Sequence, residues 1–288
     1  MKLKLAICVL FTTMFCSVSY AQSVVKSAPI GSGTGAGVKA NILLLLDSSN
    51  SMDRKVAGNI TFDSGPRDIA FDSTGNIYVG ELDGTIHKFD SSMKFIKFFG
   101  GEDQVDYPED DRLESVYSMV MDSRDYLYVA DENRGVLQRF NTDGDLDISI
   151  EVDVRSVAVD SSDNVYIVSG VDVIHYDKEL NHIKTWRPES NPSDVFVAND
   201  KIHLVHKHAP APLKNHNIGI YDLDGNQITQ LFTRVPFFPF PIYYKGITVL
   251  VASNGHIFVV SKEYSKVYEY DSSYTFVKSY GVLPSSNI

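Results

Sequence analysis

The sequence predicts an all-β fold, a β-propeller of four-stranded blades, on three observations. A unit of apolar strand, polar turn and second strand occurs five times, at residues 68–79, 118–129, 156–167, 194–205 and 248–259. Two more short strands around an Asp- or Asn-led turn follow each unit. No convincing helical periodicity follows the N-terminal segment. Four short strands that recur every 38 to 54 residues are typical of propeller blades.

The first 21 residues have the layout of a secretory signal peptide. Lys2 and Lys4 form a basic start, residues 5–18 are apolar, and Ser19 and Ala21 place small side chains before the expected cleavage site. The apolar stretch is shorter than the roughly 20 residues that a membrane-spanning helix needs. We therefore expect cleavage before residue 22 and no transmembrane span in the mature chain.

The composition of the remaining chain fits a secreted protein without disulfide bonds. Both cysteines, Cys8 and Cys16, lie in the expected signal peptide, so the mature chain would contain no disulfide. Loss of the two N-terminal lysines would take the formal net charge from −11 to −13. The absence of a basic run argues against a nucleic-acid partner. We expect a secreted, periplasmic or cell-surface location.

The Asp-rich turns are interpreted as hairpins. Asp, Asn and Gly tolerate the positive φ that tight hairpins demand. Asp143, Asp145 and Asp147 alternate as in an EF-hand loop, but Ile148 and Val154 stand where that loop needs Gly and Glu. These turns therefore predict local structure rather than calcium sites.

The repeated unit resembles the NHL repeat. The matching segments are residues 66–79, 84–90 and the terminal Gly100 in the first unit, with 128–134 and 136–140 in the second. The resemblance runs from about residue 59 to residue 281 and weakens in the fourth unit. It implies a propeller with five complete units, and residues 55–62 would add an outer strand of a partial sixth.

A different motif precedes the repeats. Residues 39–52 form an apolar strand followed by Asp-x-Ser-x-Ser, which resembles the first metal-binding loop of a von Willebrand factor A domain. The resemblance implies that Asp47, Ser49 and Ser51 hold a divalent cation, Mg²⁺ or Ca²⁺, because hard cations prefer carboxylate and hydroxyl oxygens. Such a domain also needs a Thr and an Asp from distant loops, for which the chain leaves no room. The motif is therefore a relic, a further propeller strand and turn, or part of a domain completed elsewhere.

These features divide the chain into a signal peptide (1–21), a linker with the truncated A-type strand (22–54) and a propeller (55–288). The pairing of an A-type motif with a propeller resembles the type IV pilus tip-associated adhesins. That resemblance implies a secreted or cell-surface binding and adhesion module, associated with a pilus, that contacts a protein or surface ligand. It predicts no enzymatic activity.

Two alternatives stay open. Some related propellers are lactonases or lyases with a metal in the central channel, and Glu81 and Asp131 follow the second strands of the first two units at equivalent places. Ser169 and Lys207 stand at the matching places of the next two units, so no ring of ligands emerges. The other alternative is a structural fragment of a larger envelope protein.

Two further segments have the composition of binding sites. His203, His206, His208 and His216 gather in the fourth unit, where His206 and His208 would share one face of a strand. Residues 235–244 form a proline-rich aromatic run that predicts a connecting loop. Such a loop suits a protein or glycan contact, or cover for the edge of a blade.

Overall fold

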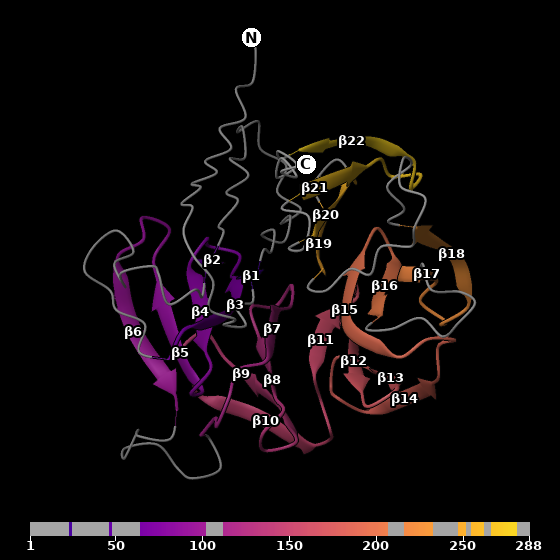
Figure 1. Cartoon of the computed structure of the whole chain (residues 1–288). Coiled ribbons are helices and arrows are strands. Elements are labelled where there is room, and N and C mark those ends of the chain that lie inside the picture. The colour runs from indigo at the N-terminus through magenta and orange to yellow at the C-terminus, as the bar shows by residue number, and fades with distance from the viewer. Residues whose placement is uncertain are drawn as a thin grey trace.

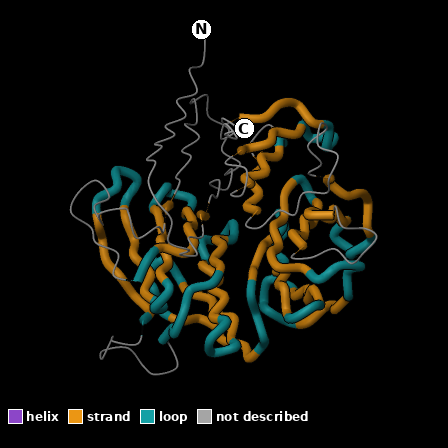
Figure 2. Tube along the Cα trace, in the orientation of Figure 1, coloured by secondary structure: helices purple, strands orange, loops and turns teal. Residues whose placement is uncertain are grey.

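The computed structural model describes residues 64–101, 112–206, 216–232, 247–251, 255–261 and 266–280, together with two short strands near the N-terminus. Five four-stranded antiparallel sheets are arranged as a five-blade β-propeller, and the described residues contain no helix (Figures 1 and 2). The predicted all-β propeller is therefore confirmed. Among the described residues there is no helix that could cross a membrane.

Each blade is an up-and-down meander of four consecutive strands. Blade 1 contains β3 (Pro66–Phe71), β4 (Ile77–Glu81), β5 (Thr85–Phe89) and β6 (Phe95–Gly100). Blade 2 contains β7 (Ser118–Met121), β8 (Leu127–Asp131), β9 (Val136–Phe140) and β10 (Leu146–Glu151). Blade 3 contains β11 (Ser156–Val159), β12 (Val165–Ser169), β13 (Asp172–Tyr176) and β14 (His182–Trp186). Blade 4 contains β15 (Pro192–Ala198), β16 (Lys201–His206), β17 (His216–Tyr221) and β18 (Gln227–Phe232), and blade 5 contains β19 (Ile247–Val251), β20 (Ile257–Ser261), β21 (Lys266–Tyr270) and β22 (Phe276–Tyr280).

The first strand of each of the first four blades lies innermost. β3 contacts β7, β7 contacts β11, and β11 contacts β15, so these strands are neighbours around the axis. The fourth strands are outermost and carry exposed apolar side chains such as Ile183 and Ile228. The apolar core is divided into clusters that mostly lie between successive blades. This arrangement explains why the first strands read as apolar runs.

A buried aspartate organises the first turn of blades 1 to 3. In blade 1, Asp72 accepts hydrogen bonds from the Thr74 and Asn76 amides at 3.0 and 2.9 Å, and from the Tyr78 hydroxyl at 3.2 Å. Burial alone would raise the pKa of Asp72, but these hydrogen bonds lower it below its usual value. Asp122 and Asp160 bind their own turns and tyrosines in the same way. The aspartates are hairpin residues, in agreement with the sequence interpretation.

Blade 4 replaces the aspartate and the tyrosine together. Ala198 stands at the turn, and His203 stands where blades 1 to 3 have tyrosine. The His203 ring is fully buried, stacks on Phe196 at 4.4 Å between ring centroids, and lies 3.1 Å from the Lys201 carbonyl through Nδ1. Nδ1 therefore donates, and in the neutral ring Nε2 accepts from the Tyr274 hydroxyl at 3.3 Å. Burial in this apolar contact favours the neutral ring.

The free energy of unfolding should decrease at acidic pH, because unfolding allows the buried His203 ring to bind a proton. Burial lowers the pKa of His203 from 6.5 to about 4. The unfolded chain therefore binds more protons than the folded chain between these values, so stability falls as the pH decreases from about 6.5 towards 4. We expect the free energy of unfolding to be about 2 kcal/mol lower at pH 5 than at pH 7.5 from this group. Urea titrations at both pH values measure the difference, and His203→Phe should remove that part of it, since blade 5 carries Phe258 at the corresponding position.

Hydrogen bonds between turns join successive blades on the face that carries these hairpins. The Ser73 hydroxyl donates to Asp125 at 2.6 Å, the Ser123 hydroxyl to Asp163 at 2.8 Å, and the Ser161 hydroxyl to Asp200 at 2.9 Å. A second series runs along the inner strands, where Asp68 accepts from the Met119 amide at 2.7 Å. The first turns therefore hold neighbouring blades in register as well as closing their own hairpins.

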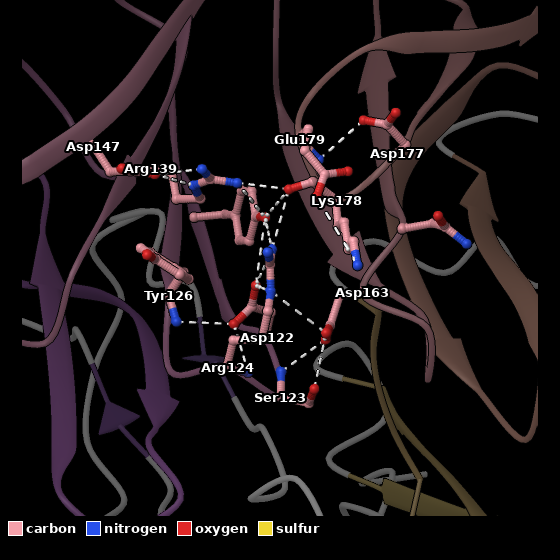
Figure 3. A network of polar contacts seen from close by, with 12 residues as sticks. Asp122, Ser123, Arg124, Tyr126, Arg139, Asp147, Asp163, Asp177, Lys178 and Glu179 are labelled. Atoms are coloured by element: carbon pink, nitrogen blue, oxygen red, sulfur yellow. Dashed lines mark hydrogen bonds and ion pairs between the residues drawn. The ribbon is translucent and has the colours of Figure 1, made fainter.

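Basic side chains of one blade bind the outer turn of the next. Lys88 Nζ lies 2.7 Å from the Thr142 carbonyl, and Lys184 Nζ lies 2.6 Å from the Asp224 carbonyl. Between blades 2 and 3, Arg139 reaches the Lys178 carbonyl at 2.6 Å (Figure 3). Arg139 also pairs with Asp147, so a buried guanidinium has both a carboxylate and a carbonyl as partners.

The sizes of the facing side chains alternate at these outer turns. A residue with positive φ in the turn faces the last strand of the preceding blade, and glycine occurs where that strand carries a ring. Phe99 faces Gly144 and Trp186 faces Gly225, whereas Ile150 and Leu180 belong to one apolar cluster and Leu231 and Tyr274 to another. A Cβ on Gly144 would lie 2.6 Å from the Phe99 ring, and one on Gly225 would lie 2.8 Å from Trp186. The turn glycines are therefore required by space as well as by φ.

The N-terminal part contributes one pair of short strands. β1 (Ser23–Val24) pairs antiparallel with β2 (Leu46–Asp47), and β1 contacts β3 of blade 1. Asp47 thus lies at the end of a strand, as the A-type resemblance implies, but Ser49 and Ser51 lie outside the described residues. The expected signal peptide, the strand at 55–62 and the aromatic run at 235–244 lie outside them as well.

Candidate functional site

The inner strands of blades 1 to 4 each have one residue displaced from the regular ladder at their first end. The register of β3 shifts between Pro66 and Asp68, which displaces Arg67, and β15 has the same shift at Ser193. In blades 2 and 3 the corresponding residues are Tyr117 and Arg155, whose amides donate to the second strand at 2.9 Å. Irregularities of this kind redirect side chains at the ends of barrels and near functional sites.

Three of these side chains and one glutamate form a continuous arc across blades 1 to 3. The Arg67 guanidinium lies over the Tyr117 ring, 5.2 Å from its centroid. The Tyr117 hydroxyl is hydrogen-bonded to Glu132, and Arg155 Nε and Nη2 lie 3.2 and 3.1 Å from Glu132 Oε1. We call Arg67, Tyr117, Glu132 and Arg155 the rim cluster, because they lie at one end of the first and second strands of their blades. Glu132 comes directly after β8, so the cluster lies on the face opposite the Asp-rich hairpins.

The electrostatics of the cluster suit binding rather than proton abstraction. Burial raises the pKa of Tyr117, and its hydrogen bond to Glu132 raises it further, whereas the two arginines act in the opposite direction. The hydroxyl is therefore a neutral donor at physiological pH. The side chains of Arg155 and Glu132 are 29% and 23% exposed, so solvent reaches them. With two arginines and one glutamate, the cluster carries a formal charge of +1 on a chain whose net charge is −11.

Glu81 and Asp131, the carboxylates singled out from the sequence, lie beside the entry to the inner strands. Glu81 accepts from the Ser64 amide at 2.8 Å and pairs with His87 at 2.5 Å. Asp131 is fully buried and accepts from the Glu114 amide at 2.7 Å and the Ser115 hydroxyl at 3.0 Å. Both carboxylates therefore anchor the segment that leads into an inner strand.

The histidines of blade 4 are separated by the strand. His203 and His206 both lie on β16 and are buried, but an odd spacing puts them on opposite faces. His208 lies outside the described residues, and nothing is described of the side chain of His216. Within the described ranges, no group of three or more His, Cys, Asp or Glu side chains is placed to hold a metal.

The sequence interpretation missed the rim cluster because its members lie inside the repeat. A usable signal was present in the residue just before the polar start of each inner strand, which is Arg67, Tyr117, Arg155, Ser193 and Ile247 in turn. The following position is Asp, Ser or Thr in all five units, so the variable position stands beside a repetitive one. Variation of this kind is expected where packing does not dictate the side chain.

Fold and site together define the chain as a β-propeller protein with a polar, aromatic rim. The family model described as strictosidine synthase-like, N-terminal, matches residues 59–89, which span most of blade 1. No curated protein matches the chain.

Solved structures share the fold at low sequence identity. A virginiamycin B lyase from Staphylococcus aureus, in its selenomethionine form, has a TM-score of 0.57 and 12% identity over 78% of this chain and 72% of that one. A catalytically inactive variant of that lyase, with quinupristin, has a TM-score of 0.57 and 11% identity over 76% of this chain and 71% of that one. At this identity the likeness shows the propeller fold alone.

Proposed function

We propose that the chain is a binding and adhesion module of the cell surface or extracellular space that contacts its ligand through the rim cluster. The observation that carries the proposal is the arc from Arg67 through Tyr117 and Glu132 to Arg155, which is polar, partly exposed and shared by three blades. Aromatic and arginine side chains are enriched in binding sites because they combine contact area with directed hydrogen bonds.

The local chemistry supports binding. The ion pair between Arg155 and Glu132 and the contact between Arg67 and Tyr117 hold these side chains before a ligand arrives, which reduces the entropy lost on binding. Tyr117 is neutral, and Glu132 is engaged by both Arg155 and Tyr117. Neither group is arranged as an activated nucleophile or a base.

The experiment is a comparison of Arg155→Gln with Arg187→Gln. Arg187 also forms an ion pair, with Asp172 at 2.8 Å, but lies outside the rim cluster. Binding to a panel of immobilised surface polysaccharides and matrix proteins is measured by surface plasmon resonance. For the ligand that binds the unaltered protein, we expect Arg155→Gln to lower the affinity at least about tenfold, since a hydrogen bond to a charged group is worth about 1.5 kcal/mol or more. Arg187→Gln should leave the affinity unchanged, and equal affinities for all three proteins would contradict the proposal.

The proposed association with a pilus rests on the resemblance to the type IV pilus tip-associated adhesins. The NHL-like repeat and the A-type motif support it, and Asp47, Ser49 and Ser51 are the residues that would hold Mg²⁺ or Ca²⁺ in that reading. The pilus association and the cation site stay predictions.

A second candidate function is a metal-dependent lactonase or lyase. The likeness to virginiamycin B lyase favours it, because propellers of this shape include an enzyme of that class. Incubation of the purified protein with quinupristin, followed by chromatography, tests it directly. Loss of quinupristin that a chelator prevents would support the enzyme over the binding module.

A further inference from the structure

We infer that blade 4 is an acid-labile unit of the propeller, which separates from blades 3 and 5 at acidic pH while blades 1 and 2 stay packed. Blade 4 lies between blades 3 and 5 in the ring (Figure 1). A histidine stands at each of its two junctions, where blades 1 and 2 carry a lysine, an arginine or a tyrosine. The inference concerns the conformation of the fold and is independent of the proposed function.

The junction between blades 3 and 4 contains His175 on β13. His175 is paired with Tyr166, as Lys88 and Arg139 are paired with the tyrosines of blades 1 and 2, and its ring stacks on the Tyr166 ring with 4.3 Å between centroids. Tyr166 packs in the apolar cluster that joins blades 3 and 4. Lys88 and Arg139 each donate to a carbonyl in the outer turn of the next blade. Nε2 of His175 is buried and, within the described part of the chain, has no hydrogen-bond partner, so this junction lacks the corresponding bond.

The packed junction favours the neutral ring of His175. Burial lowers the pKa of His175 below 6.5, and the ammonium group of Lys184 lowers it further. Asp160, Asp224 and Asp177 act in the opposite direction but do not outweigh burial. Once blade 4 separates, the ring returns to water and to its usual pKa, so it binds a proton below about pH 6.5. Acid therefore favours the separated state.

His203 has the same effect at the junction between blades 4 and 5. Its ring is fully buried, stacks on Phe196 and lies 5.9 Å from the Tyr274 ring of blade 5. Burial lowers the pKa of His203 to about 4, and the Lys201 ammonium also opposes a positive charge, against the hydrogen bonds that the ring makes to the backbone. From His203 alone, the ratio of separated to packed blade 4 should rise about 30-fold from pH 7.5 to pH 5.

The first turn of blade 4 is also tied less firmly to the preceding blade. Ser73 of blade 1 and Ser123 of blade 2 each donate to an aspartate of the next blade through both the amide and the hydroxyl. Among the described contacts, Ser161 of blade 3 donates to Asp200 through its hydroxyl alone. Ala198 stands where blades 1 to 3 have the aspartate that closes this turn. Blade 4 therefore has fewer polar links at this turn, which favours its separation before that of blades 1 and 2.

Hydrogen exchange of the full chain, followed by mass spectrometry at pH 7.5 and pH 5 and corrected for the intrinsic rate at each pH, tests the inference. We expect the protection of the central strands β16 and β17 to fall about 30-fold or more at pH 5. At that pH these strands should be at least about tenfold less protected than the matched strands β8 and β9 of blade 2. Trp186, the single tryptophan, lies against Gly225 of blade 4, so in urea at pH 5 its fluorescence should change before the far-UV circular dichroism does.

A double variant without the two titrating rings supplies the second test. His175→Phe keeps an aromatic ring on Tyr166, and His203→Phe matches Phe258 of blade 5. In the double variant, the protection of β16 and β17 should change by less than about threefold between the two pH values. His182→Gln alters an exposed histidine on β14 and should keep the full decrease. Equal protection of blades 2 and 4 at pH 5 in the unaltered protein, or the full decrease in the double variant, would overturn the inference.

Discussion

Replacing Gly144 by leucine should destabilise the protein by about 3–5 kcal/mol, the sum of backbone strain and overpacking. The φ of Gly144 is +77°, where an L-residue costs about 1 kcal/mol or more. Even the Cβ would lie 2.6 Å from Phe99 Cγ, and the Phe99 ring is fully buried and in contact with Phe140 at 5.6 Å between ring centroids. The ring has no room to withdraw. Urea denaturation of the purified variant measures the loss.

The neighbouring junction supplies the matched control. Leu180 has a φ of +62° and lies in the same apolar cluster as Ile150, so blade 3 tolerates leucine where the preceding strand carries an aliphatic side chain. Gly144→Leu combined with Phe99→Ile recreates that pair between blades 1 and 2. The double variant should recover about 1–3 kcal/mol of the loss, and a purely additive result would show that φ strain, not the aromatic ring, sets the cost.

Asp131→Ala should cost about 3–4 kcal/mol, because it leaves buried donors without an acceptor. The carboxylate is fully buried and accepts from the Glu114 amide, the Ser115 hydroxyl and the Arg134 amide, the last at 3.1 Å. These bonds fix the segment that leads into β7, which carries Tyr117 of the rim cluster. The variant should therefore lose ligand affinity together with stability.

Asp131→Asn separates the two explanations for this aspartate. An amide keeps one acceptor oxygen and the side-chain shape, so we expect it to restore about half of the lost stability. A metal ligand would behave differently, since removing the charge would abolish binding of added Mg²⁺ or Ca²⁺. Calorimetry that detects cation binding by the unaltered protein and none by the Asn variant would contradict the anchoring role.

The fold could be predicted from the sequence because the strand–turn–strand unit occurs five times. The apolar strand, the polar turn and the second strand recur in every unit, and in blades 1 to 3 the turn has the same hydrogen bonds to Asp72, Asp122 and Asp160. Local rules for turns and alternation are enough for such elements, since each unit is specified within about 40 residues.

The candidate site could not be predicted by the same rules. Glu81 and Asp131 look like ligands in the sequence, yet their partners are amides and hydroxyls of a segment about 17 residues away. Arg67, Tyr117 and Arg155 come from three different units and meet only because the inner strands lie side by side. Their proximity depends on the displaced residue at the start of each inner strand. An alignment of the repeats gives no weight to this position, because its residue type differs from unit to unit.

The pairing of turn and strand sizes also bears on how the repeats find their proper neighbours during folding. Blades of similar sequence are prone to misassembly, because any exposed apolar face can accept several partners. A turn carrying Leu180 or Tyr274 would collide with the ring of Phe99 or Trp186, while a turn carrying Gly144 or Gly225 would leave a void beside Ile150 or Leu231. The two kinds of junction therefore disfavour each other's turns, which reduces the number of incorrect blade pairings that can form during folding.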